Sequence, residues 1–80
     1  MRLDKFLKNA RLIKRRTVAN EACTQGRVKL NEKSAKAGAE VKIGDKIEIQ
    51  FGERTVKVEV LSISDHVPKG DASGLYRVIE

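Results

Sequence analysis

The sequence predicts an α+β protein in which two N-terminal helices pack on a small, mainly antiparallel sheet. Two observations predict this class. Apolar residues recur with helical spacing before Gly26, and after it they alternate with polar residues, as in strands. The chain has 80 residues, which is enough for one hydrophobic core. We therefore expect the helices and the strands to share that core.

The first helix is expected over residues 3–10. Its apolar residues recur at i, i+3, i+4 and i+7, so they form one stripe that can face the sheet. Lys5 and Lys8 are expected to project from the opposite side of this helix. The stripe consists of Leu3, Phe6, Leu7 and Ala10.

A second helix is expected over residues 17–25. Thr17 is its predicted N-cap, because the hydroxyl can accept a hydrogen bond from a free amide at the start of the helix. Gly26 is its predicted stop, since glycine readily adopts the left-handed conformation that ends a helix. The apolar face consists of Val18, Ala19, Ala22 and Cys23.

Strands are expected wherever apolar and polar residues alternate between turn-forming residues. The clearest lies at 55–63, with Val56, Val58 and Val60 on one face. The last, at 75–79, is short. The strand regions are 27–31, 40–51 with a break at Gly44-Asp45, 55–63 and 75–79.

Polar segments separate these strands. We expect a loop at 31–38, a tight turn at 52–54 and a longer loop at 64–74 that carries the only proline. The main domain is accordingly predicted to cover residues 1–64. Residues 65–80 are predicted to add a loop and a C-terminal strand or tail.

Positive charge is concentrated in the first half of the chain. The net charge is +6, but residues 1–40 carry +7 and residues 41–80 carry −1. Such asymmetry is typical of a protein with a polyanionic partner, first of all a nucleic acid and second an anionic membrane surface. No apolar run approaches the roughly 20 residues of a membrane span.

Seven basic residues crowd the first sixteen positions, and Asp4 alone opposes them. Arg15 and Arg16 precede the predicted N-cap, where each cation costs about 0.3–1 kcal/mol next to the helix dipole. A phosphate that meets the free amides and these cations would explain their presence. For Lys5 and Lys8, a merely solvated helix face remains an alternative. Asp4 is expected to pair with Lys8 or to orient Arg11 or Arg16.

The aromatic content argues for recognition of RNA shape over base readout. Phe6, Phe51 and Tyr76 are the only aromatic residues, and Phe6 is expected in the core. A stacking platform for single strands requires several exposed rings. We therefore expect contacts with the backbone of structured RNA.

Residues for catalysis or cofactor binding are few. Cys23 is expected to act as a small buried apolar residue, and His66 as a solvated loop residue. The sequence has no nucleotide-binding motif and no metal-ligand spacing. We predict that the chain is not an enzyme and needs no cofactor or metal.

Four motifs between Arg2 and Phe51 resemble those of the S4-type RNA-binding domain, in the same order and spacing: "RLDKFL", "KRRTVANEA", "GRVKLN" and "VKIGDKIEI". Two departures are Asn31-Glu32, where the family usually has Asn-Gly, and "SAKAG", where it often has proline. The resemblance implies an S4-like fold, the alpha-L motif, that contacts structured RNA. The implied RNA-binding residues are Arg2, Lys5, Lys8, Arg11, Lys14, Arg15, Arg16 and Lys36.

Among short family members, the chain resembles heat-shock protein 15 and, more closely, the small RNA-binding proteins of bacterial ribosome-associated quality control. This implies binding to rRNA and peptidyl-tRNA on the large ribosomal subunit, near a factor that tails stalled chains. It also implies a cytoplasmic, ribosome-associated protein, and the lack of a heptad pattern predicts a monomer. The alternatives are a general structured-RNA binder in ribosome assembly or heat-shock recycling, a fragment of an RNA-modifying enzyme, and a membrane-surface binder.

Overall fold

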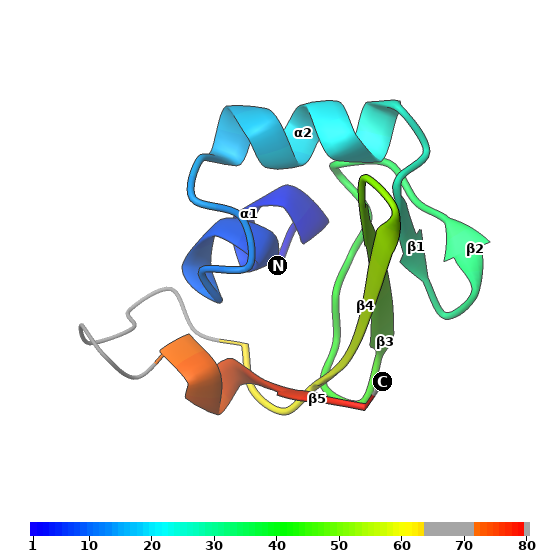
Figure 1. The fold of residues 1–80 in the computed structure, drawn as a ribbon. Coiled ribbons are helices and arrows are strands. Elements are labelled where there is room, and N and C mark those ends of the chain that lie inside the picture. The colour runs from blue at the N-terminus through cyan, green and yellow to red at the C-terminus, as the bar shows by residue number, and fades with distance from the viewer. Residues whose placement is uncertain (64–71, 80) are drawn as a thin grey trace.

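The computed structural model describes residues 1–63 and 72–79. Figure 1 shows two helices, α1 (Leu3–Asn9) and α2 (Arg16–Thr24), on the same side of one antiparallel sheet. The sheet has five strands in the order β2-β1-β3-β4-β5. Their bounds are β1 (Val28–Leu30), β2 (Lys33–Ser34), β3 (Lys46–Phe51), β4 (Arg54–Val60) and β5 (Tyr76–Val78), with the 3-10 helix η1 (Ala72–Leu75) before β5. The predicted α+β class is confirmed.

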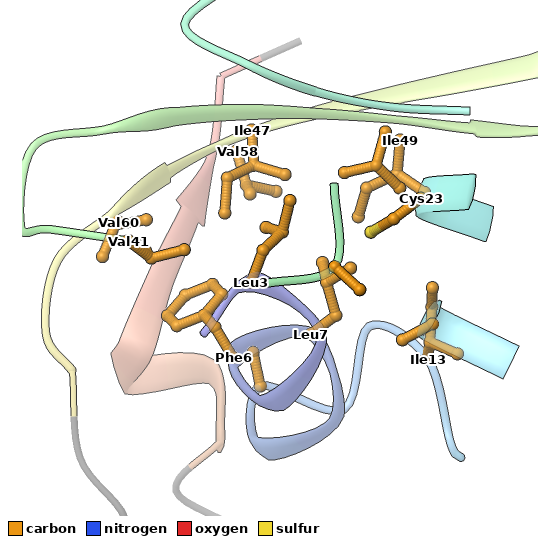
Figure 2. Close-up of a cluster of buried hydrophobic side chains, with 14 of the residues drawn as sticks. Leu3, Phe6, Leu7, Ile13, Cys23, Val41, Ile47, Ile49, Val58 and Val60 are labelled. Carbon is orange, nitrogen blue, oxygen red and sulfur yellow. The ribbon is translucent and has the colours of Figure 1, made fainter. Parts of the chain in front are cut away.

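The core lies between α1 and the inner face of the sheet, as Figure 2 shows. Leu3, Phe6 and Leu7 of α1 are fully buried, so the predicted apolar stripe of the first helix is confirmed. The alternation predicted for the strands is also confirmed, because every second residue points inward. The inward residues of β3 and β4 are Ile47, Ile49, Val58 and Val60. Val56 of β4 is half-buried and packs against this core.

The start of α2 differs from the sequence-based prediction. The helix begins at Arg16, its N-cap is Arg15, and no side chain caps it, so the prediction of Thr17 as N-cap is wrong. Val18 was also expected to be buried, but 46% of it is exposed. Only a narrow stripe around Ala19 and Cys23 meets the core, and Val18 lies about 100° around the helix from Ala19.

Both helices end in the same hydrogen-bonded motif, in which the residue after the C-cap adopts the left-handed conformation. After α2 this residue is Gly26, with φ at 77°, so the predicted stop is confirmed. After α1 it is Arg11, with φ at 58°. The amide of Arg11 donates to the carbonyl of Lys8 at 3.0 Å, and that of Leu12 to Leu7 at 3.1 Å. A residue with a side chain pays about 1–2 kcal/mol for this conformation, where glycine would not.

The turn between β1 and β2 begins at Asn31, the last residue of the motif "GRVKLN". The side chain of Asn31 contacts the motif "VKIGDKIEI". Asn31 and Glu32 both have positive φ, at 51° and 71°, in a two-residue loop between paired Leu30 and Lys33. This type of turn favours Asn-Gly, so Glu32 occupies the glycine position under strain. The Asn31 side chain donates to Asp45 at 3.1 Å and accepts from the amide of Lys46 at 3.0 Å.

Three further expectations concern the two loops and the last strand. The polar segment at 31–38, expected as a loop, contains the short strand β2. Of the loop expected at 64–74, residues 64–71 and therefore His66 lie outside the described residues, and η1 begins at Ala72. The last strand is confirmed as β5, which pairs antiparallel with β4.

We expect Glu32→Gly to raise the free energy of unfolding by about 0.5–1 kcal/mol, because glycine relieves the left-handed strain at some cost in chain entropy. Urea denaturation measures this change. Glu53→Gly serves as a control, since Glu53 does not have positive φ, and this substitution should lower the free energy of unfolding. A loss of stability in Glu32→Gly would contradict the strain assigned to this turn.

Candidate nucleic-acid interface

A buried carboxylate joins the starts of the two helices. Asp4 is only 2% exposed. Its Oδ1 lies 3.2 Å from Nε of Arg2, and its Oδ2 lies 3.3 Å from Nη2 of Arg2 and 3.3 Å from Nε of Arg16. The backbone amide of Lys5 also donates to Oδ1, at 2.8 Å. One side chain therefore fixes two arginines from separate parts of the sequence.

Of the partners expected for Asp4, the structure confirms Arg16, and it adds Arg2. In the part of the chain that the structure describes, neither Lys8 nor Arg11 forms an ion pair with Asp4. Helical spacing could not indicate Arg2, because this residue precedes the helix with extended backbone, at φ −68° and ψ 146°. Its side chain can therefore fold back over the first turn. The extended conformation is held by a bridge between Arg2 and Glu40.

The charges around Asp4 keep it ionised. Burial raises the pKa of Asp4, but hydrogen bonds from Arg2 and Arg16, together with their positive charges, lower it more. The pKa of this carboxyl is therefore below its ordinary value. One negative charge faces two positive charges, so the cluster remains positive. The two guanidiniums are about half-exposed, at 53% and 47% of their side chains.

The segment after β2 lies against the start of α1. The amide of Leu3 donates to Ala39 at 2.9 Å, and the amide of Asp4 donates to Ala37 at 3.1 Å. Lys36 is exposed and directly precedes Ala37, so the turn brings it to the end of α1 that carries Arg2. Gly38 lies next to the Arg2 guanidinium, since a Cβ at this position would be 4.0 Å from Arg2 Cζ, an ordinary van der Waals contact.

The other predicted cations lie further along the helical surface. Lys8 is exposed in the last turn of α1, and Arg11 follows its C-terminus. Lys14 and Arg15 are exposed in the linker that leads to α2. Lys5 is half-buried on α1 and has a contact of its own. We call the eight residues the basic surface: Arg2, Lys5, Lys8, Arg11, Lys14, Arg15, Arg16 and Lys36.

The basic surface has two ends. Arg2 and Arg16 contact Asp4 and Lys36 lies in the adjoining turn, whereas Lys8 and Arg11 lie at the other end of α1. A seven-residue helix is about 10 Å long, which is the scale of the separation along its axis. Within the described residues, no ion pair neutralises Lys8, Arg11, Lys14, Arg15 or Lys36. The first turn of α2 also contains no acidic residue.

Other reactive groups in the described part of the chain are few. Burial, with a smaller contribution from the charge of Asp4, raises the pKa of the Cys23 thiol to about 11. The thiol is 4% exposed, so it behaves as the expected apolar core residue. Residues 1–63 and 72–79 contain no group of His, Cys, Asp and Glu that could hold a metal ion, and no helix long and apolar enough to cross a membrane.

We expect Asp4→Asn to lower the free energy of unfolding by about 2–3 kcal/mol near neutral pH, because charge-assisted hydrogen bonds to both arginines are lost. Since the folded pKa of Asp4 is depressed, its stabilisation is present above the ordinary pKa and is lost as the pH falls through the folded value. Urea denaturation at neutral and at acidic pH checks both statements.

The difference in the free energy of unfolding between Asp4→Asn and wild type should therefore shrink as the pH falls below about 3.8. Glu40→Gln serves as the control, because this carboxylate is 66% exposed and pairs with the chain terminus. A constant difference between wild type and Asp4→Asn at every pH would contradict the role of the carboxylate charge.

Comparison with known proteins identifies the family of this chain. The S4 domain family model matches residues 1–47. The RQC P-site tRNA stabilizing factor of Halalkalibacterium halodurans is 55% identical over 98% of this chain and 89% of that protein. The factor of the same name from Bacillus subtilis is 46% identical over 100% of this chain and 93% of that protein.

A solved structure is also similar. The trimeric structure of heat shock protein 15 from Vibrio cholerae superimposes with a TM-score of 0.90 at 34% identity, over 98% of this chain and 80% of that chain. The matched family model includes both helices, β1, β2 and the start of β3, and so contains Asp4 and every residue of the basic surface. The chain therefore belongs to the S4 domain family.

Proposed function

We propose that this chain is a non-catalytic RNA-binding factor of the large ribosomal subunit that assists ribosome-associated quality control by holding rRNA and peptidyl-tRNA. The observation that carries the proposal is the buried Asp4, which fixes Arg2 and Arg16 with their guanidiniums half-exposed beside other cations. The relatives named RQC P-site tRNA stabilizing factor support the ribosomal context.

The arginine geometry suits phosphate recognition. A guanidinium has five donors, and Asp4 uses two of Arg2 and one of Arg16, so each retains donors that can meet phosphate oxygens in parallel pairs. Because Asp4 fixes both side chains in advance, less conformational entropy is lost on binding. The uncapped start of α2 adds free amides that also favour a phosphate.

The two ends of the basic surface support a bridging role. One end gathers around Asp4 and the other lies about 10 Å away along α1, so each can meet a different RNA strand. Phosphate contacts fix position without reading sequence, which suits structured rRNA and tRNA. We assign RNA contacts to the whole basic surface and an orienting role to Asp4.

The wider context follows from this proposal. The chain acts as a cytoplasmic monomer on the large subunit and supplies no chemistry, so a separate factor elongates the stalled chain. The main domain of residues 1–64 carries RNA binding. Residues 65–80 complete the fold through β5, which adds a strand next to β4.

We expect Arg16→Ala to lower affinity for large subunits that carry peptidyl-tRNA by roughly 10- to 100-fold, the value of a charge-assisted hydrogen bond to phosphate. Co-sedimentation with purified subunits, with and without peptidyl-tRNA, measures this. Arg77→Ala is the matched control, because it removes the same charge from β5, where Arg77 pairs with Glu59.

Wild type should pellet selectively with the subunit that carries tRNA, and Arg77→Ala should behave like wild type. Circular dichroism of Arg16→Ala verifies its fold. Equal pelleting of wild type and Arg16→Ala with every RNA would reduce the chain to a general polycation and contradict the proposal.

The substitution Arg11→Gly should change protein stability and RNA affinity in opposite directions. We expect it to raise the free energy of unfolding by about 1 kcal/mol, because glycine tolerates the left-handed conformation at this position. RNA affinity should fall, and the slope of log K against log salt should decrease by roughly 0.7–0.9, the value for one lost phosphate contact. Arg11→Lys retains the charge and serves as control. Unchanged affinity in Arg11→Gly would exclude Arg11 from the interface.

A further inference from the structure

A groove lies beside the basic surface, between the linker before α2, α2 itself and the end of β3. Its volume is about 430 Å³. Val18 of α2 and Phe51 of β3 contribute its exposed apolar surface, at 46% and 40% exposure, and half-buried Leu12 lies between the helices and adds to the wall. The fold thus leaves one of its two phenylalanines accessible beside the RNA-binding surface.

The charges on this groove have one sign. Lys14 and Arg27 line it, both exposed, and no acidic side chain is among its lining residues. Lys14 also belongs to the basic surface, and Arg15 follows it directly. An RNA held by the basic surface would therefore bring its backbone to the rim of the groove. Arg27 lies outside the predicted RNA-binding set, because it follows Gly26 at the far end of α2.

We propose that this groove takes one unpaired RNA base, which stacks on Phe51, while phosphates of the same strand lie toward Lys14 at one end of α2 and Arg27 at the other. The inference rests on the proposed RNA-binding function and adds a contact that detects a single-stranded position. Every base has a flat π-face, so stacking on one aromatic ring tolerates any sequence. A paired base cannot enter, since its faces are covered by neighbours in the duplex.

The size of the exposed apolar surface favours a base over a protein segment. A bound amphipathic helix inserts anchors at i, i+3 or i+4 and i+7, and needs an apolar groove along about two turns. Here the exposed apolar residues that line the groove are Val18 and Phe51, and cations flank them. One flat apolar group with an attached anion matches this arrangement.

The test compares two hairpin RNAs that differ in one bulged adenosine. Wild type should bind the bulged hairpin more tightly by about 5- to 150-fold, the value of one base stacked on an aromatic ring. Phe51→Leu keeps apolar bulk but removes the ring, so it should lose most of this preference and bind the paired hairpin as wild type does. Arg16→Ala should weaken binding of both hairpins equally.

A second readout places 2-aminopurine at the bulge. Its fluorescence should change when wild type binds, and much less when Phe51→Leu binds. Val18→Ser, at an exposed position, should reduce the preference in the same direction. Unfolding free energies of the variants verify that each is folded under the conditions used.

Three outcomes would overturn the inference. If wild type binds both hairpins equally and depends on Arg16, the groove is not a base site, although RNA binding stands. If neither hairpin binds, the inference fails together with the proposed function. If no preference exists but Phe51→Leu no longer pellets with ribosomes, a protein segment occupies the groove.

Discussion

The ion pairs of Asp4 with Arg2 and Arg16 determine how the surface of this protein is arranged. A buried carboxylate is costly unless it is paired and hydrogen-bonded, so removal of either arginine leaves a poorly compensated charge in the core. The pairs connect the extended N-terminus, the first turn of α1 and the first turn of α2. Cations that would repel each other are thereby held close together and directed outward.

The two faces of the molecule differ in how their charged side chains are paired. On the outer face of the sheet, Glu48 lies between Lys29 and Lys57 at 3.6 and 3.5 Å, and Glu59 pairs with Arg77 at 2.6 Å. These pairs neutralise the cations across neighbouring strands. On the helical side, Asp4 is the acidic partner of two arginines, whereas Lys8, Arg11, Lys14, Arg15 and Lys36 form no ion pair with any residue in 1–63 and 72–79. The cations of the basic surface are thus less neutralised than the paired cations on the outer face of the sheet.

Periodicity in the sequence was sufficient to predict the α+β class, the two helices and every strand except β2, because α1 and the longer strands bury residues at fixed intervals. It could not predict that Val18 is exposed, because the spacing of apolar residues does not determine how wide a stripe of α2 packs against the core. The pairing of Arg2 with Asp4 depends on the extended backbone before α1, and the left-handed Arg11 occupies a position where glycine is the usual residue. Such features are set by tertiary contacts and by backbone conformation, which a one-dimensional pattern does not contain.

The buried Cys23 has a practical consequence for studying this protein. With its pKa raised to about 11 and its sulfur nearly inaccessible, the thiol has little reactive thiolate at neutral pH. The native chain has no second cysteine. A cysteine introduced at an exposed position of the sheet can therefore be labelled with a maleimide fluorophore while Cys23 stays in place. The core requires no substitution before the protein is followed on single ribosomes.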